Sequence, residues 1–246
     1  MGTTTTPRTG YGDLQRLMAL IPGDPKHPVG DTSTLDVIWT LYDRVLNVSP
    51  DTVDDPARDR FLLSKGHNPD AYYAVLAAKG FFPTSWLTSV ADFDSPLGRH
   101  PDRVLVPGVE VSSGSLGHGL PLGIGVAHGL RAQGIQSRVY VLIGDAELDE
   151  GSNHEAIAYA GAAGLELTVV VVDNQSATNG WPGGIARRFV AHGWSAVTVD
   201  GRDHDALETA FRAPTAGRSD GATTGRSEAV GAGRPHVVVA RVVPKQ

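Results

Sequence analysis

The stretch Val-Tyr-Val-Leu-Ile-Gly-Asp-Ala-Glu, residues 139–147, joins an apolar run directly to a polar turn. An unbroken apolar run such as 139–143 is typical of a strand that is buried on both faces of a sheet. A similar run, Leu-Thr-Val-Val-Val-Val, occupies residues 167–172 and is followed by Asp173 and Asn174. Because a helical pattern separates the two runs, they predict a βαβ unit and therefore a parallel sheet.

The rest of the chain repeats this alternation of strands and helices. Further strands are expected at 61–63, 196–199 and 236–243, and helices at 11–21, 35–46, 70–80, 114–133, 150–163, 184–192 and 203–212. We therefore expect an α/β fold of three layers, with helices on both faces of a mainly parallel central sheet. Residues 11–246 are expected to form a single domain, preceded by a flexible tail, 1–10, and carrying a flexible insertion at 214–235.

Composition excludes several classes of protein. The chain has 246 residues, of which 41% are hydrophobic and 20% charged, as in an ordinary globular domain. Its net charge of −6 argues against a nucleic-acid-binding protein, and cysteine is absent, which excludes disulfides and thiolate metal sites. No apolar stretch is long enough to cross a membrane and the first ten residues do not resemble a secretory signal. A cytoplasmic location is expected.

Polar residues follow two of the predicted strands. In open parallel sheets, ligands bind beyond the carboxyl ends of the strands. Asp145 follows the strand 139–143, and Asn174 follows the strand 167–172. A carboxylate and an amide oxygen, completed by backbone carbonyls, suit Mg²⁺ or Ca²⁺, and the helix expected from 150 can present N–H groups to phosphate. The pattern indicates a metal–diphosphate site, although Asp and Asn at strand ends are also common turn residues.

The segment Gly144-Asp145-Ala146-Glu147-Leu148-Asp149-Glu150-Gly151, followed by Asn174, resembles the thiamine-diphosphate motif of transketolases, which begins Gly-Asp-Gly and ends in Asn. Other segments resemble further transketolase motifs: His27-Pro28-Val29-Gly30, Ser64-Lys65-Gly66-His67, His100-Pro101-Asp102, Pro107-Gly108-Val109-Glu110, Gly114 to Gly119, and Asp200 to His204. The resemblance covers roughly residues 11–212 and is confined to the N-terminal, diphosphate-binding domain of that family. Ala146 departs from it, because the family has glycine at this position.

The resemblance implies a role for particular residues. Mg²⁺ (or Ca²⁺) would be bound by the side chains of Asp145 and Asn174 and by the carbonyl of Ser176. The residues implied to contact thiamine diphosphate are His67, Gly114, Leu116, Gly144, Asp145, Ala146 and Asn174. Among them, His67 and the Ala146 amide would hold the diphosphate, and Gly114 and Leu116 would line the aminopyrimidine.

Four further residues are implied to act in catalysis. His27 and His100 would face the thiazolium ring, where the sugar reacts, and an imidazole there suits proton transfer at neutral pH. Glu150 and Glu155 would belong to a carboxylate network that links paired active sites.

The implied function is that of the N-terminal subunit of a split transketolase, which transfers a two-carbon ketol unit between sugars or sugar phosphates. Its C-terminal subunit would be a separate chain, in an α₂β₂ assembly without nucleic acid or membrane. Two alternatives stay open: a related thiamine-diphosphate carboligase or decarboxylase subunit, and a non-catalytic paralogue that stabilises a partner. Ala146 favours the non-catalytic alternative, whereas Asp145, Asn174, His67 and His100 argue against it.

Overall fold

A five-stranded, wholly parallel sheet forms the centre of the part of the chain that the structure describes, with strand order β1-β2-β3-β5-β4. The structure is a computed structural model that describes residues 9–23, 33–67, 69–177, 179–213 and 234–243. The strands are β1 (Arg60–Leu63), β2 (Val139–Gly144), β3 (Thr168–Asp173), β4 (Ser195–Asp200) and β5 (His236–Arg241). The parallel sheet predicted from the alternation of strands and helices is confirmed.

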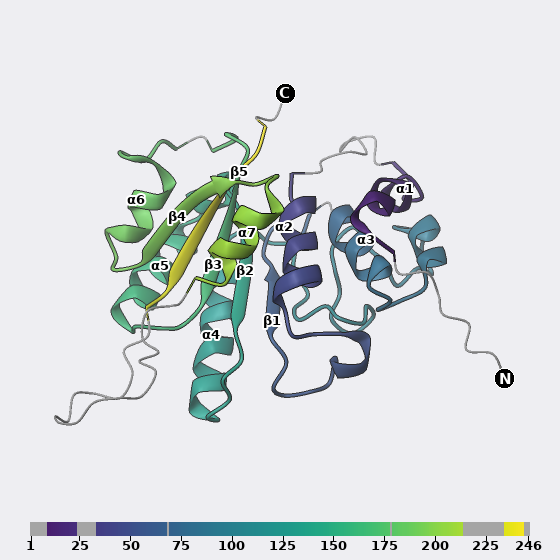
Figure 1. Cartoon of the computed structure of the whole chain (residues 1–246), viewed down its shortest axis with the longest axis horizontal. Coiled ribbons are helices and arrows are strands. Elements are labelled where there is room, and N and C mark those ends of the chain that lie inside the picture. The colour runs from purple at the N-terminus through teal and green to yellow at the C-terminus, as the bar shows by residue number, and fades with distance from the viewer. Residues whose placement is uncertain (1–8, 24–32, 68, 178, 214–233, 244–246) are drawn as a thin grey trace.

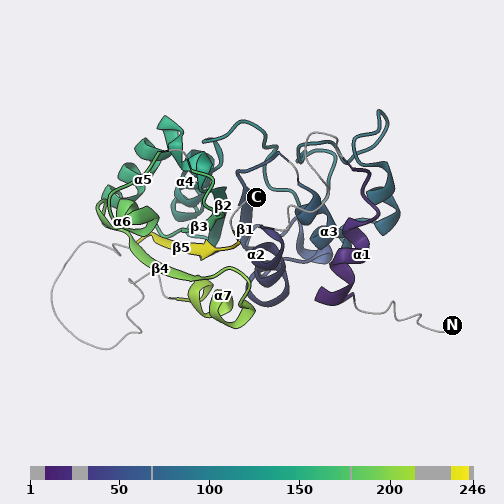
Figure 2. The same ribbon diagram turned by 90° about the horizontal axis from the view of Figure 1, so that it is seen from above.

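Helices cover both faces of this sheet. They are α1 (Leu14–Met18), α2 (Leu35–Thr40), α3 (Asp70–Ala78), α4 (Gly119–Ala132), α5 (Gly151–Ala162), α6 (Gly184–Val190) and α7 (His204–Phe211), and a π-helical turn, Leu41–Val45, extends α2. Short 3₁₀ turns occupy Tyr11–Asp13, Pro50–Thr52, Thr84–Ser89 and Ala146–Asp149. Figure 1 gives the order of the elements, and Figure 2 shows α4, α5 and α6 on one side of the sheet with α2 and α7 on the other. The expected three-layer α/β fold is confirmed.

Alternate residues of each strand enter two different cores. In β2, Tyr140 and Leu142 belong to the core under α1, α2, α3 and α7. Val141 and Ile143 belong to the core under α4, α5 and α6. Side chains of a strand alternate between faces, so a strand covered on both faces must be apolar throughout. This requirement explains the unbroken apolar runs that predicted the strands.

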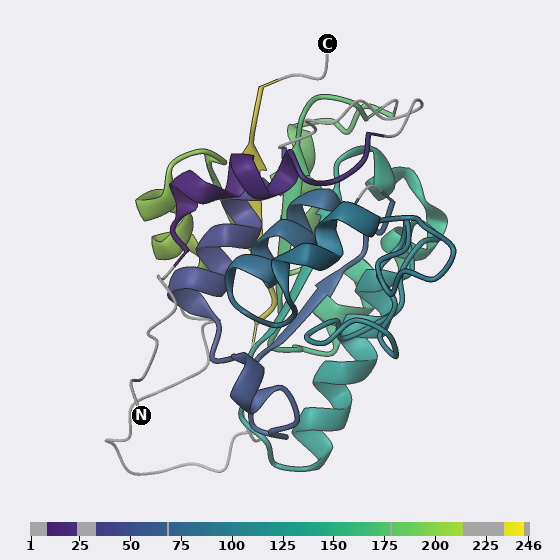
Figure 3. The same cartoon turned by 90° about the vertical axis from the view of Figure 1, so that its right-hand side faces the viewer.

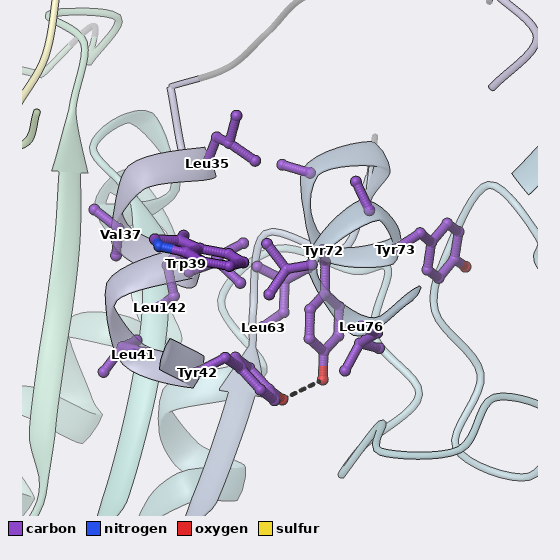
Figure 4. Packing of buried hydrophobic residues seen from close by; sticks show 14 of the residues in the cluster. Leu35, Val37, Trp39, Leu41, Tyr42, Leu63, Tyr72, Tyr73, Leu76 and Leu142 are labelled. Atoms are coloured by element: carbon purple, nitrogen blue, oxygen red, sulfur yellow. Dashed lines mark hydrogen bonds between the residues drawn. The ribbon is translucent and has the colours of Figure 1, made fainter. Parts of the chain in front are cut away.

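Aromatic residues fill the core between α2, α3 and β1. Tyr42 packs edge-on against Phe61 of β1, with ring centroids 5.5 Å apart. The hydroxyl groups of Tyr42 and Tyr72 lie 3.1 Å apart and form a buried hydrogen bond (Figure 4). The Tyr72 hydroxyl also donates to the carbonyl of Gly108, 3.2 Å away, and therefore ties α3 to the loop that leads to α4.

The segment that resembles the family's Asp-Gly-His-Asp motif is tied to α2. Arg202 and the His204 ring both hydrogen-bond the Asp36 carboxylate, which is 3% exposed. The Tyr11 hydroxyl donates to the same carboxylate. Although burial acts to raise the pKa of Asp36, these hydrogen bonds outweigh it and hold the pKa below the usual range. The Asp36 carboxylate therefore joins α2 both to this motif, after β4, and to Tyr11 near the N-terminus.

The predicted helix 114–133 begins later than expected, at Gly119. The cause is Gly117, whose φ of +79° lies in the left-handed region and cannot continue a right-handed helix. The helix expected from 150 is likewise preceded by a 3₁₀ turn over Ala146–Asp149. The helix expected at 11–21 ends at Met18. The tail 1–10 and the insertion 214–235 lie almost wholly outside the described residues, and across the described ranges no helix is long and apolar enough to cross a bilayer.

Glycines on one face of α4 allow it to pack directly on the sheet. A Cβ atom added at Gly123 would overlap Cγ2 of Val141, a stiff β-branched side chain in β2. A Cβ added at Gly125, two residues further on, would meet nothing within 4 Å. Close packing therefore accounts for Gly123 but not for Gly125.

We predict opposite effects for the two Gly→Ala substitutions in α4. Gly123→Ala should lower the free energy of unfolding by about 1–3 kcal/mol through overpacking against β2. Gly125→Ala should raise it by up to about 1 kcal/mol, because alanine favours a helix more than glycine does. Urea unfolding of the two variants beside the parent chain measures both. Stabilisation by Gly123→Ala would contradict the packing described.

Candidate functional site

The carboxyl ends of β1, β2 and β3 meet at one edge of the sheet, the upper edge in Figure 1. In the parallel register, Gly144 at the end of β2 pairs with Val172 near the end of β3. The Asp145 amide then donates to the Val172 carbonyl over 3.1 Å. Asp145 and Asn174 therefore emerge side by side, as their positions after the two strands predicted.

Asp145 draws the loop after β3 over the strand tips. Its carboxylate, in a residue only 2% exposed, accepts from the Ser176 amide at 2.6 Å and from the Ser176 hydroxyl at 2.7 Å. The Ala177 amide donates to the same carboxylate at 3.2 Å. Gln175 makes this return possible with a φ of +56°, a left-handed conformation that is uncommon outside glycine and often marks functional loops.

The side-chain oxygen of Asn174, Oδ1, is a buried polar atom at this edge of the sheet that has no hydrogen-bond partner among the described residues. Asn174 as a whole is 8% exposed. Buried polar atoms are normally paired, so an unpaired amide oxygen at the strand tip next to that of Asp145 is suited to a cation. In the described ranges no group of three or more His, Asp or Glu side chains could hold a metal ion, so a cation here would need one carboxylate, one amide and backbone carbonyls.

The end of β1 contributes a second wall. Ser64 is 1% exposed, and His67, three residues later, is half-buried. Between them, the Lys65 side chain packs over Gly144: a Cβ atom added at Gly144 would lie 3.5 Å from Lys65 Cδ. A Cβ added at Gly66 would come within 2.7 Å of the Ser113 carbonyl carbon. Only glycine at position 66 therefore lets the β1 loop approach the loop that precedes α4.

That loop brings His100 to the site. The ring of His100 covers Gly114, since a Cβ added at Gly114 would lie 3.3 Å from His100 Cδ2. The Tyr73 hydroxyl donates to the Gly98 carbonyl at 2.9 Å, and the Ser113 amide donates to the Pro101 carbonyl at 3.3 Å. These bonds fix both sides of His100, although its own side chain is exposed.

The remaining predicted residues are distributed less closely. Leu116 is half-buried in the turn before α4, and its carbonyl lies 3.1 Å from His118 Nδ1. Glu150 occupies the N-cap position of α5 without a side-chain capping hydrogen bond, is exposed, and packs its Cβ against Gly117. Glu155 is exposed further along α5. His27 lies outside the described residues.

The sequence analysis assigned no role to Glu147, which it named only as one residue of the thiamine-diphosphate motif. It is 2% exposed and accepts hydrogen bonds from Ser64, Gly117 and Gly144. Burial raises the pKa of its carboxyl, although these hydrogen bonds act in the opposite direction. The sequence alone gave no signal for this, because a glutamate is usually exposed and its donors here, Ser64 and Gly117, are distant in the sequence.

Ala146 fits its backbone position without strain. It is the first residue of the 3₁₀ turn Ala146–Asp149 and is exposed, and it is not among the described residues with positive φ. Alanine is therefore as acceptable here as glycine, and its exposed position leaves the amide available to a ligand.

The chain is similar to known proteins over most of its length. Residues 20–237 match the family described as transketolase, thiamine diphosphate binding domain. A protein of Rhodococcoides fascians named Ferredoxin fas2 is 56% identical over 203 residues, which are 82% of this chain and 67% of that protein. A protein of Actinobacillus succinogenes named as one subunit of apulose-4-phosphate transketolase is 41% identical over 147 residues, 60% of this chain and 53% of its own length.

A solved structure shows the same fold. A transketolase from Pichia stipitis matches 94% of this chain with a TM-score of 0.69 at 22% identity, and the match covers 36% of that protein. The chain thus spans between about a third and two thirds of the length of these proteins. Protein iron–sulfur clusters are held mainly by cysteine thiolates, and these 246 residues include none, so the name ferredoxin does not carry over.

We predict that Ala146→Gly destabilises the chain slightly instead of relieving strain. Glycine in the 3₁₀ turn should cost about 0.5–1 kcal/mol of stability through its greater backbone freedom when unfolded. Cofactor affinity, measured by calorimetry, should stay within about threefold, because glycine keeps the amide. A tenfold loss of affinity would mean that the Ala146 methyl group itself packs against the ligand.

Proposed function

The chain belongs to the transketolase family through its thiamine-diphosphate-binding domain, and we propose that it is the N-terminal subunit of a split transketolase. It would transfer a two-carbon ketol unit between sugars or sugar phosphates in the cytoplasm. The observation that supports this most directly is the unpaired, buried Oδ1 atom of Asn174, at the strand tip next to that of Asp145. The Actinobacillus succinogenes relative, which is named as one subunit of a transketolase, supports the division of the enzyme between two chains.

A divalent cation, Mg²⁺ or Ca²⁺, would be held by the side chains of Asp145 and Asn174 and by the carbonyl of Ser176. All three oxygens are hard ligands, which such cations prefer. The amide and the hydroxyl of Ser176 already donate to the Asp145 carboxylate, at 2.6 Å and 2.7 Å. These bonds hold the Ser176 backbone, and with it the carbonyl, close to Asp145. The loop therefore needs little ordering to complete the site.

The diphosphate would bind to the exposed Ala146 amide, beside Gly144, and to His67 at the end of β1. The aminopyrimidine would pass between Gly114 and Leu116. When bound, thiamine diphosphate supplies the carbanion chemistry, and the protein supplies binding and orientation. Gly114 is suited to this place because a side chain there would press on the His100 ring.

His100 would exchange protons with the hydroxyl groups of the sugar. The hydrogen bonds at Gly98 and at Pro101 hold the backbone on both sides of it, and its exposed ring can reach a substrate. An imidazole can both donate and accept a proton near neutral pH. His27 would assist it, and Glu150 and Glu155 would form the carboxylate network between paired sites.

A second chain would cover exposed apolar side chains on the elements that carry the site. In the segment between α3 and α4, whose loops gather on one side in Figure 3, Phe93 is 101% and Val104 89% exposed. On α4 and α5, Leu122 and Tyr159 are 46% and 52% exposed. Exposed apolar side chains of this size favour a protein interface, and an α₂β₂ assembly with the C-terminal transketolase subunit would provide one.

We predict that thiamine diphosphate binds only with a divalent metal. Calorimetric titration of the chain together with its partner subunit should show binding with Mg²⁺ and none in EDTA, since a bare diphosphate beside several carboxylates is unfavourable. Asp145→Ala should abolish binding. Asp200→Asn removes a similar charge at the exposed tip of β4 and should leave the affinity within about threefold. Full binding in EDTA would exclude the metal assignment.

We also predict that the isolated chain, saturated with Mg²⁺ and thiamine diphosphate, transfers no ketol unit from any ketose donor. Addition of the C-terminal subunit should restore turnover. In the mixed enzyme His100→Ala should lower kcat by about 10²-fold or more, the usual contribution of a general acid–base group. Turnover by this chain alone would refute the split enzyme, and an unchanged kcat would remove His100 from the chemistry.

A further inference from the structure

Glu147 is buried under the loops of the candidate site and is not one of the residues proposed to contact the cofactor. It is the second residue of the 3₁₀ turn Ala146–Asp149, between β2 and α5, and only 2% of its surface is exposed. A buried carboxylate is costly unless donors surround it, so the groups that face it indicate its purpose.

The carboxylate of Glu147 holds three separate segments of chain. Its Oε1 atom accepts from the Ser64 hydroxyl, at the end of β1, and from the Gly117 amide, 2.9 Å away, before α4. Its Oε2 atom accepts from the Gly144 amide, 3.2 Å away, at the end of β2. The Ser64 hydroxyl in turn accepts from the amide of Gly119, the first residue of α4, at 2.9 Å.

The backbone of Glu147 holds a fourth element. Its carbonyl accepts from Asn153 Nδ2 at 2.7 Å and from the Glu150 amide at 3.1 Å. Asn153 lies on α5 and is completely buried. Glu147 therefore joins α5, through its main chain, to the three loops that its side chain binds.

Each of the three loops carries residues of the proposed cofactor site. Ser64 precedes His67, Gly117 follows Gly114 and Leu116, and Gly144 precedes Asp145 and Ala146. These loops come from distant parts of the sequence, and the amides of Gly117 and Gly144 are paired with Glu147. Without Glu147 the buried Gly117 amide and the part-buried Gly144 amide would lose their acceptor.

We propose that Glu147 is a positioning residue, whose carboxylate fixes the relative places of the three loops that hold the diphosphate and the aminopyrimidine. This inference rests on the proposed function. These loops carry the groups that bind the cofactor, so an error of about 1 Å in their relative places should weaken cofactor binding most.

Asp59 is the matched control at the opposite edge of the sheet. It precedes β1, is 6% exposed, and accepts from the Asn47 and Arg138 amides, both at 2.8 Å. Arg138 precedes β2, so Asp59 joins the starts of the same two strands whose ends Glu147 joins. Asp59 therefore matches Glu147 in burial and in accepting from two backbone amides. It also forms a salt bridge of 2.6 Å with the Arg138 guanidinium, so its loss should cost at least as much stability, but it lies at the end of the strands remote from the cofactor loops.

The first test compares Glu147→Gln with Asp59→Asn in the unliganded chain by amide hydrogen exchange. The Gln amide group cannot accept from both backbone amides and leaves a donor facing a donor. For Glu147→Gln we expect exchange to rise at least tenfold at Gly117 or at Gly144, whichever amide faces the new NH₂ group. For Asp59→Asn we expect the rise at Asn47 or at Arg138. Unchanged protection of both Gly117 and Gly144 in Glu147→Gln would overturn the proposal.

The second test measures binding of Mg²⁺ and thiamine diphosphate to the complete enzyme, together with thermal unfolding of each variant. We expect Glu147→Gln to raise the apparent KM for the cofactor at least tenfold while kcat at saturating cofactor falls less than threefold. Asp59→Asn should leave that KM within threefold even where it lowers the unfolding temperature as much. An equal rise in both variants would reduce Glu147 to a structural residue. Failure of the parent enzyme to bind cofactor would contradict the proposed function instead, while the exchange experiment still decides whether Glu147 fixes the loops.

Discussion

The parallel pairing of β2 with β3 is the constraint on which the candidate site depends. The register of Gly144 with Val172 continues into the bond from the Asp145 amide to the Val172 carbonyl, so the two strand tips end level. Both strands are buried on both faces, and their side chains enter two separate cores. A shift by one residue would exchange the two faces of a strand, so the cores that stabilise the sheet also fix where Asp145 emerges.

Close backbone approach is the second constraint, and it explains several of the glycines. A side chain at Gly66 would push the β1 loop away from Ser113, and one at Gly119 would collide with Ser64. At Gly117 a positive φ is required as well, because the chain turns there against Glu150 before α4 begins. The glycines at the site thus bring three loops within hydrogen-bond distance of one another, which lets a single carboxylate reach them.

Sequence reasoning predicted what depends on periodicity and failed where one residue changes direction. The runs 139–143 and 167–172 predicted β2 and β3 within a residue or two, because burial on both faces imposes an apolar residue at every position. The position of Asp145 and Asn174 at neighbouring tips followed from the same pattern. The start of α4 could not be predicted at Gly119, since a glycine-rich sequence does not reveal which glycine adopts a positive φ. Burial of Glu147 could not be predicted either, because it depends on Ser64 and Gly117, which are distant in the sequence.

The electrostatics of the site follow from how its acids are paired. Glu147 is shielded by backbone amides and a hydroxyl, so its charge is met by fixed dipoles that need no rearrangement when a ligand arrives. Asp145 is also hydrogen-bonded, yet Asn174, at the tip of the neighbouring strand, has an amide oxygen without a partner among the described residues. A carboxylate has about four acceptor positions, so Asp145 keeps room for a cation after accepting from Ser176 and Ala177. Two acids that are two residues apart thus take different roles. Glu147 accepts hydrogen bonds from three loops of the protein. Asp145 and Asn174 instead offer oxygen atoms to a cation or a donor that is not among the described residues.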